Sequence, residues 1–353
     1  MSPFCKLADP GSYSPCRLDL AAHAEARAYW LVFFKKQIST LAAAGIESAV
    51  ARGESLAAAQ SHAEQFRQAY TSHLDAFAAH PEDYGRVTIL TCDAWRDASL
   101  RNAGFADAFA ELKERENAAM LPLLPKVCRQ LDSLRGEEQV IAAVEGVFAG
   151  NIFDMGVEAT AKAFKDTSPD FFQIRSRLTP RPWLIDDFDS LLKRLLAKPH
   201  RKAVYFIDNA GSDFLLGALP MMRWMAMRGT HIVLAANEVP TLNDMTIHDV
   251  RQWWGRIVEM EPSFATLPFE PVSTGTADPL IDLANVSDEL NNASADADFV
   301  ILEGMGRAVA SNIDVKFACD GLNIAMIKDA WTANQWGGRQ FDLVCRFQHR
   351  SVD

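Results

Sequence analysis

Short apolar runs alternate with helical segments in the second half of the chain, and this alternation limits the possible folds more than any other feature. The runs are AVYFI at 203–207, HIVLAA at 231–236, FVILEG at 299–304, LNIAMIK at 322–328 and FDLVCRF at 341–347. Buried parallel strands are continuously apolar, and the helices between them cover both faces of the sheet. We therefore predict an α/β fold, a three-layer α/β/α sandwich with a largely parallel sheet.

The first part of the chain follows a different pattern. From about Asp19 to Asp132 apolar residues recur at helical spacing, and strand signals are nearly absent. At 353 residues the chain has room for roughly two domains. We predict a helical N-terminal region at 1–135 and an α/β domain at 136–353.

Composition limits the partners and the compartment of the protein. A net charge of −11 argues against a nucleic-acid partner, since phosphate backbones need a basic face. No apolar run approaches the roughly 20 residues of a membrane span, and the N-terminus lacks a signal pattern. The six cysteines are scattered without a CxxC motif, which is typical of reduced thiols. We expect a soluble cytoplasmic protein that binds neither nucleic acid nor membrane. The oligomeric state stays open.

Polar residues follow four of the predicted strands. They are Asp208 and Asn209, Asn243 and Asp244, Glu303 to Arg307, and Lys328. The carboxyl ends of parallel strands meet at one edge of a sheet, where binding sites form. The coincidence of all four groups at one edge predicts a functional site there.

Three of these side chains suit a hard divalent cation. Mg²⁺ takes a few carboxylate or amide oxygens and completes its shell with water and phosphate oxygens, and Asp208, Asn209 and Asp244 fit such a sparse set. Each also has a purely structural interpretation, because Asp and Asn commonly cap helices and form turns.

The remaining strand-end residues suit an anion. Arg307 can hold a phosphate with two hydrogen bonds, and Lys328 can act as a point charge in an otherwise acidic chain. Gly304 and Gly306 permit close backbone approach to the anion, although EGMGR can equally be a plain turn.

At these residues the chain resembles a known family. The segment FIDNAGSDFLLGALPMMRWMAMRGTHIVLAANEVPTLNDMT, the motif EGMGRAV followed by Asn312, and LNIAMIKDAW…GGRQFDLVCRF resemble the metal-dependent damage-control phosphatases, formerly domain of unknown function 89. EGMGR resembles the second subfamily, which includes plant single-domain phosphatases and the C-terminal domain of the fourth pantothenate kinase-type protein of animals. GNIFDMG at 150–156 is also similar, and the resemblance covers nearly the whole chain. Because 353 residues leave no room for a preceding kinase-like domain, the single-domain plant proteins are the expected analogue.

The resemblance implies a helical N-terminal region on an α/β/α domain that hydrolyses phosphate monoesters with Mg²⁺, Mn²⁺, Co²⁺ or Ni²⁺. The metal ligands of the family fall on Asp208, Asn209 and Asp244. The implied substrates are small phosphorylated metabolites, namely 4′-phosphopantetheine and its oxidised or sulfonated forms, whose removal would keep damaged intermediates out of coenzyme A synthesis.

The mechanism that we expect has alternatives. Metal-activated water is favoured over an aspartyl-phosphate on Asp208, because the DxD pattern of haloacid-dehalogenase-type phosphatases is absent. Asp154 or Glu303 would position that water or protonate the leaving alkoxide. Asn151 and Asn312 would contact substrate.

Two rival functions remain open from the sequence. A Rossmann-like methyltransferase shares the architecture, but it would need a glycine-rich loop after its first strand, where this chain has DNAG with a single glycine. A non-catalytic subunit that binds a metal or a phosphometabolite for regulation would carry the same polar residues. Phosphate release with added divalent ions distinguishes the latter from a phosphatase.

Overall fold

The structure is a computed structural model that describes residues 1–152 and 171–350. The chain forms two compact units. The sheet unit comprises Met1–Tyr13, Glu116–Val239 and Asp244–Asp353, and the helical unit comprises Ser14–Arg115 and Pro240–Asn243. The division into domains at 1–135 and 136–353 stays a prediction.

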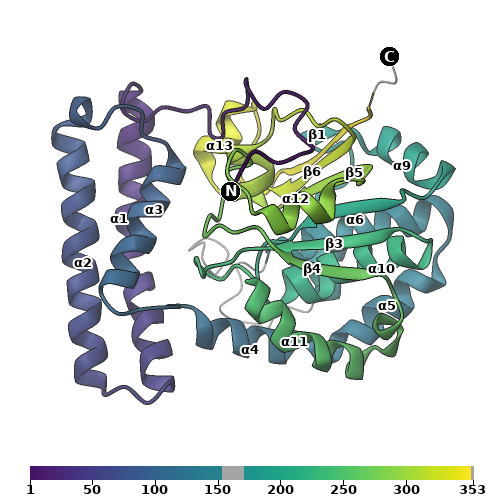
Figure 1. The fold of residues 1–353 in the computed structure, drawn as a ribbon, viewed down its shortest axis with the longest axis horizontal. Coiled ribbons are helices and arrows are strands. Elements are labelled where there is room, and N and C mark those ends of the chain that lie inside the picture. Colours follow the sequence, from purple (N-terminus) through teal and green to yellow (C-terminus); the bar gives the residue numbers. More distant parts are fainter. Residues whose placement is uncertain (153–170, 351–353) are drawn as a thin grey trace. The chain divides into compact units, whose positions relative to one another are not determined.

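The sheet unit confirms the predicted fold class. Within the described residues the sheet has seven strands in the order β1-β7-β6-β5-β2-β3-β4. Figure 1 shows this sheet, with β1 and β3 to β6 labelled. All neighbouring strands are parallel except β6 and β7, which are antiparallel. The strands are β1 (Ile185–Asp186), β2 (Lys202–Phe206), β3 (His231–Ala236), β4 (Phe269–Ser273), β5 (Phe299–Glu303), β6 (Asp320–Met326) and β7 (Leu343–Gln348).

Side chains alternate between the two faces of the sheet, and each face supports its own core. On β2, Ala203 and Tyr205 join one apolar cluster, and Val204 and Phe206 join the other. Helices cover both clusters, which gives the predicted three layers. In the described part of the chain beyond residue 102, the helices and helical turns are α4 (Ala110–Met120), η2 (Leu121–Leu123), α5 (Leu124–Ser133), α6 (Gly136–Ile152), α8 (Phe171–Ser176), α9 (Phe188–Ala197), η3 (Asp213–Ala218), α10 (Leu219–Met227), α11 (Ile247–Met260), η4 (Pro262–Ala265), α12 (Asp288–Ser294), η5 (Met305–Ser311) and α13 (Ala330–Gln335).

Three details of the sheet unit differ from the sequence expectation. The helix expected at 212–228 begins with a π-helical segment, η3, and continues as α10, in whose first turn Pro220 lacks an N–H donor. Strands β1 and β4 gave no clear signal. The first has two residues, and the second carries Pro271 at the edge of the sheet.

The first residues of the chain are also more ordered than their composition suggests. Ser2 pairs with Val286 and Leu7 with Phe317 in isolated β-bridges. Phe4 is fully buried and packs edge-to-face against Phe206, with ring centroids 5.5 Å apart. The N-terminal segment therefore belongs to the core of the sheet unit.

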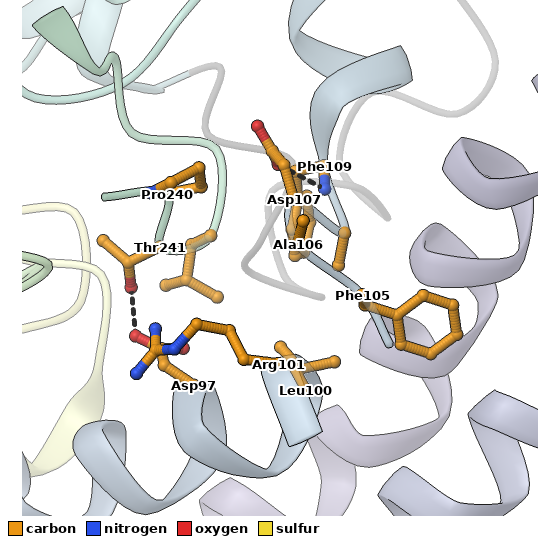
Figure 2. A pocket seen from close by; sticks show the side chains of 11 residues that line it. Asp97, Leu100, Arg101, Phe105, Ala106, Asp107, Phe109, Pro240 and Thr241 are labelled. Carbon is orange, nitrogen blue, oxygen red and sulfur yellow. Dashed lines mark hydrogen bonds between the residues drawn. The ribbon is translucent and has the colours of Figure 1, made fainter. Parts of the chain in front are cut away.

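The helical unit is built on α1 (Ala24–Ala51), α2 (Leu56–Ala79), η1 (Pro81–Tyr84) and α3 (Ile89–Asn102). Its buried Arg96 donates to Asp93, to Asp97 at 2.7 Å and to Thr241 at 3.0 Å. Thr241 in turn donates to Asp97 at 2.6 Å, beside the pocket that Figure 2 shows. Arg96 thus neutralises two acids and anchors the segment 240–243 to α3.

In the described parts of the chain, no helix combines the length and the apolarity that crossing a bilayer requires.

Several donors surround the buried carboxylate of Asp320 at the start of β6. Asp320 accepts hydrogen bonds from Arg194 at 2.7 Å, His200 at 2.8 Å, His349 at 2.7 Å and the backbone N–H of Arg350 at 2.9 Å. Burial alone would raise the pKa of Asp320, but the hydrogen bonds from His200, Arg350 and His349 outweigh it and hold this pKa well below its usual range.

We expect Asp320→Asn to lower the free energy of unfolding by about 2 kcal/mol at pH 7, because the neutral side chain loses charge-assisted hydrogen bonds. The folded-state pKa lies below the unfolded value of about 4, so this stabilisation is present above that value and is lost as the pH falls towards the folded pKa. Urea titrations between pH 7 and pH 2 should show a steeper loss of stability in the wild type than in the variant. The exposed Asp296→Asn is the control and should change stability by less than about 0.5 kcal/mol. Parallel pH curves for the wild type and Asp320→Asn would contradict the expectation.

Candidate functional site

The order of the strands creates a switch point at the centre of the sheet. From β2 the chain adds β3 and β4 towards one edge, then returns to place β5 and β6 on the other side of β2. Ligands bind in α/β sheets outside the carboxyl ends of the strands at such a reversal. Asp208 follows β2 there, and Glu303 ends β5 beside it.

Arg307 joins two of the predicted metal ligands. Its Nη1 donates to Oδ1 of Asp208, and its Nη2 donates to Oδ2 of Asp244 at 2.6 Å. An isolated β-bridge between Asn209 and Asp244 holds the two segments together. All four side chains are buried. Two carboxylates that face one guanidinium are close enough to act on a common charged group.

The Asn209 amide lies among carboxylates. Its Nδ2 donates to Oδ2 of Asp208 at 2.8 Å and to Oδ2 of Asp213 at 2.9 Å. Asn151 donates to the same two oxygens, at 3.2 Å and 2.7 Å. Asn151 reaches them because α6 packs closely on η3. A Cβ on its neighbour Gly150 would lie 2.8 Å from a backbone oxygen of Ser212.

Glu303 and Gly304 line the same edge. Glu303 is fully buried, and within residues 1–152 and 171–350 neither of its carboxyl oxygens has a hydrogen-bond partner. Gly304 has φ +90° and ψ 151°, a conformation open almost only to glycine. A Cβ at this position would overlap the carboxylate of Asp208. The glycine is therefore needed for Asp208 to lie against the β5 terminus.

Among the described residues at these strand ends, acidic side chains outnumber basic ones, and burial together with this imbalance raises the pKa values of the carboxyl groups. Burial raises the pKa of Asp208 well above its usual range, and Asp244 and Asp213 add to the rise while Arg307 and Lys328 oppose it. Burial, with the charges of Asp213 and Asp208, likewise raises the pKa of Glu303. Among the described residues that produce these shifts, four carboxylates share two basic side chains.

The other predicted site residues lie apart from this cluster or serve its backbone. Asn312 donates from Nδ2 to the carbonyl of Arg307 at 3.0 Å and accepts from the Tyr13 hydroxyl at 2.8 Å, so it braces the Arg307 turn. Gly306 packs against the carbonyl of Pro279, where a Cβ would come within 2.7 Å. Asp154 lies outside the described residues.

Sequence reasoning missed three residues of the cluster. Asn237 directly follows β3 and donates to Oδ2 of Asp244 at 3.2 Å, so the strand-end rule that selected Asp208 would have found it. Asp213 lies one turn beyond Asn209 and resembled an ordinary helix-start acid. Asn117 accepts from the N–H of Gly211 at 2.7 Å, and nothing in its sequence context indicated this contact.

The donor set fits a hard divalent cation. It consists of carboxylates and amides, and within the described residues the oxygens Oδ1 of Asp213, Asn151 and Asn237 are buried without a hydrogen-bond partner. In the same part of the chain, no three His, Cys, Asp or Glu side chains converge as a metal-binding group. A cation held by Asp208, Asn209 and Asp244 would therefore depend on an amide and on water as well as on two carboxylates, as Mg²⁺ commonly does.

Comparison with known proteins gives a consistent family signal. A model of the "Damage-control phosphatase ARMT1-like domain" matches residues 32–344. The damage-control phosphatase At2g17340 of Arabidopsis thaliana is 37% identical over 82% of this chain and 80% of its own length. A pantothenate kinase 2 of the same plant is 34% identical over 99% of this chain, and a 4′-phosphopantetheine phosphatase of Mus musculus is 31% identical over 97%. The chain spans less than half the length of these last two relatives, 42% and 48%.

A solved structure has a similar fold. The crystal structure of a DUF89 family protein from Pyrococcus horikoshii superimposes with a TM-score of 0.60 over 88% of this chain and 96% of the other. The sequence identity is 16%, so this similarity concerns the fold alone.

The role of Gly304 can be separated from simple backbone strain. We expect Gly229→Ala to cost about 1–2 kcal/mol, because its φ is +98° but no atom lies within 4 Å of the added Cβ. Gly304→Ala adds an overlap with Asp208 to the same kind of strain and should cost at least about 2 kcal/mol more. Denaturant unfolding of both variants measures the difference. Equal losses of stability would show that Asp208 does not depend on the missing side chain.

Proposed function

Because the chain belongs to the damage-control phosphatase family with the ARMT1-like domain, we propose that it hydrolyses small phosphate monoesters with a bound divalent metal ion. The observation that carries the proposal is the buried edge where Asp208 and Asp244 face one guanidinium, that of Arg307. Such a concentration of acids, amides and a basic group matches the needs of a dianionic phosphate and its counter-ion.

Asp208, Asn209 and Asp244 would hold the metal. The family is known for metal-dependent phosphatases, and Mg²⁺, Mn²⁺, Co²⁺ and Ni²⁺ are the candidates. When bound, the ion would neutralise phosphate charge and lower the pKa of an attacking water. Asn237 supports this set, because its amide donates to Oδ2 of Asp244 at 3.2 Å.

Arg307 and Lys328 would bind the phosphate. Arg307 donates from both terminal nitrogens to carboxylates, and the second N–H of each terminal nitrogen can donate to phosphate oxygens. Lys328 is buried and its charge acts on Asp208 and Asp213, so it supplies positive potential at the same edge. Asn312 keeps Arg307 in place through the backbone.

Glu303 is our candidate for positioning the attacking water or for protonating the leaving alkoxide. It ends β5 next to Gly304, where a Cβ would overlap Asp208, and within residues 1–152 and 171–350 its carboxyl oxygens accept no hydrogen bond by distance and angle. Asp154 is the alternative candidate for this role, and it lies outside the described residues. Attack by water is favoured over a phosphorylated Asp208, because the DxD pattern of haloacid-dehalogenase-type phosphatases is absent at Asp208.

For the substrate we propose 4′-phosphopantetheine or its oxidised or sulfonated forms. The support is the relative in Mus musculus that is named 4′-phosphopantetheine phosphatase and is 31% identical. Hydrolysis of these compounds would remove damaged precursors from coenzyme A synthesis.

The activity itself can be tested with p-nitrophenyl phosphate and phosphopantetheine. We expect phosphate release that EDTA abolishes and Mn²⁺ or Co²⁺ restores. Asp208→Asn should lower kcat/KM at least about 100-fold, because the site loses a carboxylate that would balance the ion. Asp320→Asn, at the amino-terminal end of β6, is the matched control and should retain activity. A fully active Asp208→Asn variant, or a wild type that no divalent ion stimulates, would refute the proposal.

Arg307→Lys tests the phosphate-binding role. The lysine keeps the charge but loses the two-pronged geometry, so KM and the inhibition constant of inorganic phosphate should both rise about tenfold. Steady-state kinetics with inorganic phosphate as competitor measure both constants at saturating metal. A fall in kcat with unchanged constants for the ester and for phosphate would place Arg307 elsewhere in the reaction.

A further inference from the structure

Asp213 contacts two residues of the proposed site but has no role in the proposed reaction. It is the first residue of η3 and is buried, and it lies one helical turn after Asn209. We propose that Asp213 is a positioning residue that fixes the amide of Asn209 so that its oxygen, rather than its nitrogen, is presented to the cation. This inference rests on the proposed function, because it assigns a role towards the metal of that site.

The hydrogen bonds of Asn209 set the direction of its amide. An amide nitrogen has two N–H groups, and both are used, towards Oδ2 of Asp208 and Oδ2 of Asp213. Rotating the amide by half a turn would direct its carbonyl oxygen at two carboxylates. The carboxylates therefore select the orientation in which Oδ1 points away from them. Only that oxygen can coordinate a hard cation, since the NH₂ group is a donor.

Asp213 contributes to this selection in a way that Asp208 cannot. Asp208 is itself a proposed ligand, and its other oxygen already pairs with Arg307. Its hold on Asn209 competes with its own coordination of the ion. Asp213 is outside the proposed ligand set, so it can hold the amide whether or not the ion is present. Partners that orient metal ligands in this way affect metal affinity strongly.

Asp213 is itself held in place. Its Oδ2 also accepts from Nδ2 of Asn151 at 2.7 Å and from the backbone N–H of Asn209 at 3.2 Å. The N–H of Phe214 donates to the carbonyl of Asn209 at 3.2 Å, and this hydrogen bond stabilises the turn that contains Asp213. Three donors on one carboxylate oxygen give it a defined position.

The second oxygen of Asp213 indicates more than a structural cap. Oδ1 is buried and, within the part of the chain that the structure describes, accepts no hydrogen bond. A buried carboxylate oxygen without a partner is destabilising, and an ordered water can supply the hydrogen bond that it lacks. A residue that served only to cap the 209–214 turn would need Oδ2 alone.

Asp213→Asn in the full chain separates the two roles. The variant keeps the shape, but a neutral amide oxygen holds the three donors on Oδ2 less strongly than a carboxylate oxygen does. If Asp213 orients Asn209, we expect the affinity for Mn²⁺, measured by calorimetry, to fall about 10- to 100-fold. The KM for Mn²⁺ should rise by the same factor, and kcat at saturating Mn²⁺ should change by less than about threefold. The Tm measured in EDTA should stay the same or rise, because one of four clustered acids becomes neutral.

Asp320→Asn is the matched control, since it neutralises a buried aspartate of the same unit at the amino-terminal end of β6, away from the strand ends that carry the site. It should lower the Tm in EDTA and leave Mn²⁺ affinity unchanged. An unchanged Mn²⁺ affinity in Asp213→Asn would overturn the inference. A drop in its metal-free Tm as large as that of Asp320→Asn would also overturn it, because Asp213 would then be a structural cap. A wild type that binds no Mn²⁺ would instead refute the proposed function.

Discussion

The pairing of Arg307 with Asp208 and Asp244 is the interaction on which the rest of the sheet unit depends. Three segments that lie far apart in the sequence meet in it: the end of β2, the segment before α11 and the turn after β5. Burying three charges is costly unless they neutralise one another, so each segment must end where the other two place their charges. The glycine at 304, the amide of Asn209 and the brace from Asn312 all serve to bring these charged groups into contact.

The order of the strands explains why these charged groups meet at the centre of the sheet. Strands β2 and β5 are neighbours only because the chain reverses its direction of addition after β4. At such a reversal the connections from the two strands lead away to opposite sides, which is where binding sites form in α/β sheets. A sheet that added its strands in sequence order would have separated Asp208 from Glu303. Topology, rather than local sequence, therefore decides which polar strand ends act together.

The sequence predicted those parts of this arrangement that leave a local signature. Continuous apolar runs revealed β2, β3, β5, β6 and β7, and the polar residues after four of them pointed to the edge where Asp208 and Arg307 meet. The order of the strands has no local signature, because it is set by packing between distant segments. Asp213 was missed for a related reason. An acid at the start of a helix is ordinary, and its importance comes from the neighbours that folding provides. Strand β4, with its proline, shows that edge position can also suppress the usual strand pattern.

The burial of Phe4 against Phe206 and Phe317 has a consequence for how the molecule is made. During synthesis the first residues leave the ribosome long before the strands that they pack on, and they must wait for more than half of the chain. Contacts of such long sequence separation form late and slow the folding of a domain. Until then the aromatic surface of the nascent sheet unit stays open to chaperones and to other chains, so translation speed and the length of any N-terminal extension bear directly on the yield of native protein.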